Sequence, residues 1–92
     1  MLGVYMNVKM IKFDEIHYGW KIKFVIELNE EENSKFNMKP IKHVGSYDIK
    51  KNNNVISFDF VFDRGELLKN ETIEERLEVI KEDVTNLVVS CL

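Results

Sequence analysis

The segment Glu71–Leu92 constrains the fold most, because its apolar residues predict one long amphipathic α-helix. Apolar side chains recur along it at alternating steps of four and three residues, at Ile73, Leu77, Ile80, Val84, Leu87 and Cys91. That spacing aligns them in one stripe on one side of a helix. Thr72 and Glu75 have the spacing of a capping box, which predicts where the helix begins. Such a stripe is stable only against an apolar surface, which the rest of the chain must provide.

Four earlier segments alternate between apolar and polar side chains, which is the period-two pattern of β-strands. They span residues 4–13, 18–28, 41–49 and 55–63. In the second segment Trp20, Ile22 and Phe24 fall on one side and lysines fall on the other, so a slip of one residue would expose every apolar group. The fourth segment alternates phenylalanines with small or polar residues. We therefore expect a sheet with one strongly apolar face.

Interruptions of these patterns predict a bulge or a doubly covered strand, a loop and a turn. The apolar parity reverses between Met10 and Phe13, so either a β-bulge shifts the register near Met10 or both faces of the strand are partly covered. Residues 29–39 contain consecutive glutamates and few large apolar groups, which predicts a long loop. Residues 50–54 predict a turn, because asparagine tolerates positive φ. Pro40 has no N–H and is expected at the start of the third strand or at a sheet edge.

Together these elements predict one α+β domain over residues 1–92, in the order β-β-β-β-α. We expect a four-stranded antiparallel β-meander with the long C-terminal helix packed on one face. A single helix leaves the other face of the sheet open to solvent or to a partner. The content of 45% apolar and 32% charged residues is that of a folded domain and not of a disordered chain.

The sequence contains no motif for a cofactor or a metal ion. Its four glycines lie singly, which excludes a phosphate-binding loop, and its single cysteine excludes an internal disulfide. We therefore expect no cofactor and no metal. No apolar run approaches the ~20 residues needed to span a bilayer, and the N-terminus lacks the apolar core of a signal peptide. We expect a cytoplasmic protein that does not contact membranes.

Few side chains suit acid–base catalysis, so we expect no enzymatic activity. His17 and His43 lie on different predicted elements, and neither has a cysteine or carboxylate at metal-ligand spacing. Two pairs of carboxylates are better explained as loop or strand-end charges; they are Asp14 with Glu15 and Asp59 with Asp63. Cys91 lies on the apolar stripe and is expected to be a small buried residue rather than a nucleophile.

Negative charge is concentrated in the second half of the chain. Residues 1–51 carry nine basic and seven acidic residues, whereas residues 52–92 carry four and nine. The candidate protein-binding residues are the carboxylates expected on the outer side of the helix, Glu71, Glu74, Glu75, Glu78, Glu82 and Asp83. Two explanations stay open: a solubilising face that also favours the helix dipole, or a surface that docks on a basic site of another protein. Val79 and Val89 lie off the stripe and are candidates for a small hydrophobic contact or a dimer seam.

Two functions from different classes remain open. The first is a small acidic protein-binding module that occludes a partner protein with a basic surface. Inhibitors, immunity proteins and phage-encoded anti-defence proteins such as anti-CRISPR antagonists act in this way, and a homodimer is a further candidate. The alternative is a nucleic-acid-binding protein with a lysine-bearing sheet face formed by Lys9, Lys21, Lys23, Lys42, Lys50 and Lys51. We favour the first, because a net charge of −3 is not the basic footprint typical of nucleic-acid binding.

Overall fold

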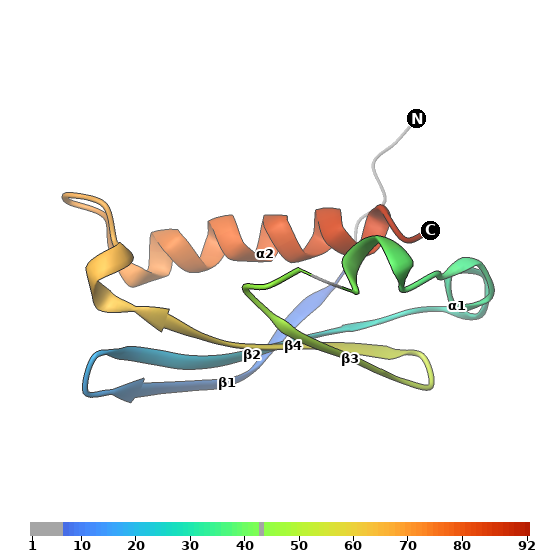
Figure 1. The fold of residues 1–92 in the computed structure, drawn as a ribbon, viewed down its shortest axis with the longest axis horizontal. Helices are drawn as coiled ribbons and strands as arrows, with labels where there is room; N and C mark the ends of the chain where they lie inside the picture. Colours follow the sequence, from blue (N-terminus) through green and yellow to red (C-terminus); the bar gives the residue numbers. More distant parts are fainter. Residues whose placement is uncertain (1–6, 43) are drawn as a thin grey trace.

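A long helix lies along one face of a four-stranded antiparallel sheet in the computed structural model, which describes residues 7–42 and 44–92 (Figure 1). The strands are β1 (Val8–Ile16), β2 (Gly19–Glu27), β3 (Asp48–Asn52) and β4 (Val55–Asp63). The helices are α1 (Glu30–Lys35) and α2 (Ile73–Val89), and two 3-10 turns are η1 (Lys39–Ile41) and η2 (Arg64–Glu66). The predicted α+β class, the antiparallel sheet and the C-terminal helix are confirmed.

The order of the strands differs from that of the predicted meander. The sheet has the order β1-β2-β4-β3, so β2 pairs with β4 and β3 lies at the outer edge. The reason is apolar content: Ile56, Phe58 and Phe62 of β4 are buried, whereas every residue of β3 is exposed or partly exposed. The more apolar strand takes the interior place, and residues 28–47 form a connection long enough to bring β3 round to the edge.

The predicted third strand over residues 41–49 is wrong in its first half. Its start is the 3-10 turn η1 with Pro40 in the first turn, and pairing with β4 begins only at Asp48. Proline suits the start of a helical turn because it lacks the N–H that a strand ladder requires. Ile41 is nonetheless buried, with 1% of its surface exposed. Pairing continues to Asn52, and the turn shrinks to the next two residues, with Asn53 at φ 55°.

Helix α1 replaces the first part of the predicted loop over residues 29–39. Asn29 caps it: the Asn29 side chain accepts a hydrogen bond from the Glu32 N–H at 2.8 Å, and Glu32 Oε1 accepts one from the Asn29 N–H at 2.9 Å. The three glutamates of its first turn favour the positive end of the helix dipole. This helix buries no side chain, so the apolar pattern carried no signal of it.

The core lies between α2 and the apolar face formed by β2 and β4. Leu77, Ile80, Val84 and Val88 are the buried residues of α2. The sheet contributes six residues that are at most 6% exposed, namely Trp20, Ile22, Phe24, Ile26, Ile56 and Phe58. Of the two explanations for the parity change in β1, the structure shows the bulge, because the register with β2 shifts between Met10 and Lys12.

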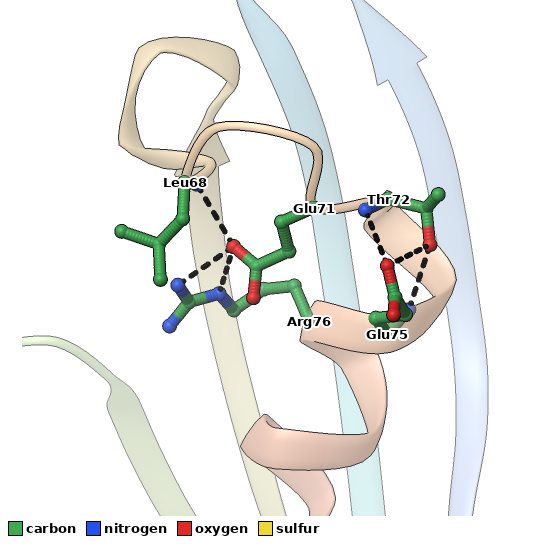
Figure 2. A network of polar contacts seen from close by, with 5 residues as sticks. All are labelled: Leu68, Glu71, Thr72, Glu75 and Arg76. Atoms are coloured by element: carbon green, nitrogen blue, oxygen red, sulfur yellow. Dashed lines mark hydrogen bonds and ion pairs between the residues drawn. The ribbon is translucent and has the colours of Figure 1, made fainter.

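The predicted capping box at the start of α2 is also confirmed (Figure 2). Thr72 Oγ1 accepts a hydrogen bond from the Glu75 N–H at 3.2 Å, and Glu75 Oε1 accepts one from the Thr72 N–H at 2.9 Å. Both bonds satisfy backbone donors that have no partner inside the helix. The carboxylate of Glu75 is therefore engaged in capping the helix and is not a free group of the predicted acidic face.

Candidate protein-binding surface

The carboxylates of the predicted acidic face fall into two groups. Glu71, Glu75 and Asp83 accept hydrogen bonds within the molecule, whereas the other three are exposed and one of them, Glu78, has a single long contact with Lys81. Glu71 is the most enclosed, because its Oε1 accepts hydrogen bonds from the Leu68 N–H at 3.0 Å and from Arg76 Nη2 at 2.8 Å (Figure 2). These bonds lower the pKa of Glu71 below its ordinary value. The ion pair is partly buried and fastens the loop before α2 to the first turns of the helix.

We expect Glu71→Gln to destabilise the protein at neutral pH and much less in acid. A carboxylate with a lowered pKa in the folded state stabilises that state above its unfolded pKa, and the contribution disappears as the pH falls through the folded value. Urea midpoints of wild type and variant should therefore differ at pH 7 and converge towards pH 3. Glu74→Gln is the matched control, because Glu74 is exposed and lies outside the ion pairs of the described residues. A difference in urea midpoint between wild type and Glu71→Gln that stays constant with pH would contradict the prediction.

Asp83 fastens α2 to the segment that precedes β3. Its Oδ2 accepts a hydrogen bond of 2.6 Å from the hydroxyl of Tyr47. The Tyr47 ring packs edge-on against Phe58 and Phe60, with centroid distances of 5.8 and 5.1 Å. Burial, the hydrogen bond to Asp83 and the negative charge of that carboxylate raise the pKa of Tyr47, so it remains a donor in neutral solution. Sequence reasoning missed this contact because the two residues come from predicted elements with no known relative position.

Glu74, Glu78 and Glu82 form the second group, which we name the acidic ridge. All three are exposed and lie four residues apart, so they follow one another along the outer side of α2. Within the described part of the chain, the ridge has a single ion pair, a long contact of 3.9 Å between Lys81 Nζ and Glu78. Like charges at this spacing cost a helix about 0.2–0.5 kcal/mol per pair. The ridge is therefore a negative surface that a single long ion pair neutralises only in part.

A groove lies between α2 and β4, and none of the three ridge carboxylates lines it. Its volume is about 310 Å³, and we name it the α2–β4 groove. Its apolar lining includes Tyr47, Phe60, Phe62, Val79 and Ile80, and Ser46, Glu66, Arg76 and Asp83 add polar or charged groups. Val79 is 53% exposed, and Glu82 lies three residues further along the helix. The groove is thus an apolar contact site in which Val79 is exposed, and the position of Val79 off the apolar stripe was the sequence signal for it.

The lysines of the nucleic-acid alternative are only partly brought together. The register places Lys9, Lys21, Lys23 and Lys50 on the face of the sheet that α2 leaves open. Lys51 lies on the opposite face, with its ammonium 5.9 Å from the centre of the Phe36 ring, and Lys42 follows η1 outside the sheet.

Carboxylates largely balance the lysines of this open face. Lys23 Nζ lies 3.9 Å from Asp59, Lys50 Nζ lies 3.8 Å from Asp48, and Lys12 and Asp14 make a third pair at 3.7 Å. Trp20, the largest aromatic residue of β2, is buried on the other face. An interface for single-stranded nucleic acid combines positive charge with exposed aromatic rings. The described residues provide neither on this face.

The other candidate residues do not converge on a catalytic or metal site. His17 is exposed in the turn between β1 and β2, and His43 lies outside the described residues. Asp63 accepts a hydrogen bond from the Gly65 N–H at 2.7 Å and so caps η2. Cys91 is 4% exposed, and its burial raises the pKa of the thiol. Across residues 7–42 and 44–92, no three His, Cys, Asp or Glu side chains are grouped as metal ligands would be.

Comparisons with known proteins returned no match. The sequence matches no protein-family model, and no curated protein or solved structure matches it significantly. Within the described parts of the chain, no helix has both the length and the apolar character that crossing a membrane requires.

Proposed function

We propose that this protein is a protein-binding module that docks on a basic surface of a partner protein through the acidic ridge. The observation that carries the proposal is the exposure of Glu74, Glu78 and Glu82 along one side of α2, where the described residues provide a single long ion pair, from Lys81 to Glu78 at 3.9 Å. The ridge supplies long-range attraction to a positive patch and accelerates association. The exposed Val79 supplies an apolar contact at the centre of such an interface. Glu71, Glu75 and Asp83 support this surface by holding α2 in place.

Its mode of action in this proposal is occlusion rather than catalysis. A protein of 92 residues that covers a functional surface of a partner needs neither a cofactor nor a catalytic group. Inhibitors, immunity proteins and phage-encoded antagonists of host defence, such as anti-CRISPR antagonists, are the classes that act in this way. We place this protein among them, in the cytoplasm, and not among the enzymes.

Charge reversal on the ridge should abolish partner capture. We expect Glu78→Lys with Glu82→Lys to weaken binding at least tenfold, chiefly by slowing association, because both changes repel a basic surface. The matched control is Glu27→Lys with Glu30→Lys, which makes the same change in net charge at exposed positions on β2 and α1. Wild type, ridge variant and control variant are used in parallel as bait in a lysate of the source organism, with mass spectrometry of the retained proteins.

The pattern of retention decides between the functions. A protein that is retained by wild type and control, but lost with the ridge variant, supports the proposal. Equal retention by all three baits contradicts it. Retention that disappears after nuclease treatment favours nucleic-acid binding instead, and that alternative requires loss with Lys21→Ala and Lys23→Ala and a steep decrease of affinity with salt.

A further inference from the structure

The outer edge of β1 is a long unpaired strand edge. Among residues 7–42 and 44–92, β2 is the single neighbour of β1 in the sheet, so no described strand lies on the other side of Val8–Ile16 (Figure 1). Three large apolar residues are exposed here: Met10 at 42%, Ile11 at 59% and Phe13 at 38%. An exposed apolar edge of this kind is a template for pairing with another strand.

The hydrogen-bonding direction of this edge follows from one contact in β2. The Tyr18 carbonyl accepts a hydrogen bond of 2.8 Å from the Arg64 N–H, so the backbone groups of Tyr18 point towards β4. Backbone direction alternates along a strand, and Trp20, Ile22, Phe24 and Ile26 therefore point the same way. The β1 residues opposite these four direct their N–H and C=O groups to the free edge; they are Glu15, Phe13, Met10 and Val8.

The bulge in β1 restricts how a partner strand can align. Side chains of Met10 and Phe13 lie on the α2 side of the sheet, and those of Lys9 and Asp14 lie on the open side. The extra residue at Ile11 reverses the alternation between these two halves. A two-fold axis between residues 10 and 11 matches the faces of the two halves but sets Lys9 opposite Lys12 of the second copy. An axis between residues 11 and 12 also matches the faces and avoids that like-charge pair. The second copy then carries its own extra residue at the same place.

This register is complementary in charge and in apolar contact. It sets Lys9 opposite Asp14 of the second copy and Met10 opposite Phe13 of the second copy, and the symmetry repeats each pair. Lys12 of each copy lies next to the axis, so one like-charge contact stands against the two opposite-charge pairs. Opposite charges and apolar groups stabilise such cross-strand pairs, whereas like charges destabilise them. An axis moved along the strand to Asp14 would instead set that carboxylate against itself. A second copy of this chain thus fits the edge through the sequence of β1 alone.

We propose that this protein forms a two-fold homodimer in which β1 pairs antiparallel with β1 of a second copy and joins the two sheets into one. The interface is separate from α2, so each copy retains its own acidic ridge, and the inference does not depend on the proposed function. Edge pairing buries a small area, so we expect a reversible dimer with a dissociation constant on the order of 10 µM. Two linked ridges would give the dimer bivalent binding.

A charge exchange tests this pairing in the intact protein. Sedimentation equilibrium from about 1 to 300 µM, a range that brackets the expected constant, measures the dimer. Lys9→Asp alone and Asp14→Lys alone should each weaken it at least tenfold, because each creates two like-charge contacts. The double variant restores opposite charges across the interface and should recover a dimer within about threefold of wild type. Lys50→Asp makes the same change on β3 at the other edge of the sheet and should have no effect.

Recovery of the dimer in the double variant would show that the single variants lose strand pairing and not their fold. A single variant that had misfolded would not be rescued by a second change. A wild type that is monomeric throughout the range overturns the proposal, and so does a double variant no better than the singles. The ridge variant Glu78→Lys with Glu82→Lys should dimerise as wild type does. Failure of partner binding and failure of dimerisation are therefore distinguishable.

Discussion

We expect Phe58→Ala to lower the free energy of unfolding by about 3–5 kcal/mol. Phe58 is fully buried, pairs with Phe24 of β2 and Ile49 of β3, and receives the edge of the Tyr47 ring. Its truncation removes a large apolar side chain and leaves a cavity that strands paired on both sides cannot close. The total free energy of unfolding of a native protein is about 5–15 kcal/mol. The variant should therefore be partly unfolded near 37 °C.

Urea denaturation followed by circular dichroism measures this loss, and Val61→Ala on the same strand is the control. Val61 is 45% exposed on the opposite face, so we expect its truncation to cost less than about 1 kcal/mol. Equal losses for the two variants would show that β4 does not bury its phenylalanines against α2. The comparison therefore tests the orientation of the central strand and not the presence of a fold alone.

Gly19→Ala should destabilise the protein by about 3 kcal/mol, the second largest effect that we predict. A Cβ atom at Gly19 would lie 2.0 Å from the carbonyl oxygen of Phe62 and 3.0 Å from Cα of Asp63. Both are backbone atoms of β4, so no side-chain rotation relieves the overlap, and the ends of β2 and β4 must separate. The cause is steric, because the described glycines have no positive φ.

Gly45→Ala is the matched control, since a Cβ there meets no atom within 4 Å. We expect that variant to stay within about 0.5 kcal/mol of wild type. Melting temperatures of both variants, together with amide hydrogen exchange of β2 and β4, measure the difference. Loss of protection in Gly19→Ala should begin at the Trp20 and Phe62 end of the strand pair. Two variants of equal stability would contradict the close approach of the backbones.

Local sequence patterns were sufficient for the elements that make many local contacts. The apolar stripe of α2 and the capping box of Thr72 and Glu75 each join residues three or four positions apart, and both were predicted correctly. Strand β4 has the predicted bounds, because its alternation is uninterrupted. Helix α1 was missed because it is stabilised by caps and first-turn charges rather than by apolar burial. The predicted start of the third strand was wrong, because residues around Pro40 form a 3-10 turn although their apolar residues alternate as in a strand.

Only the tertiary structure shows which carboxylates of the candidate surface have partners within the molecule. In the sequence, six carboxylates of the helix region are equivalent acidic groups. Folding brings Leu68 and Arg76 to Glu71 and the Tyr47 hydroxyl to Asp83, and it leaves the acidic ridge without comparable partners. Spacing along a helix cannot reveal such contacts, because the donors come from other segments of the chain.

The amino-acid sequence by itself determined the α+β class, the amphipathic helix and the apolar face of the sheet. Each depends on interactions between residues a few positions apart, which periodicity and capping patterns report directly. Only the tertiary structure decided the strand order, the partners of Glu71 and Asp83, and the balance of charge on the open face. These depend on the free energy of packing distant segments together, which places β4 inside the sheet and leaves β1 and β3 at its edges.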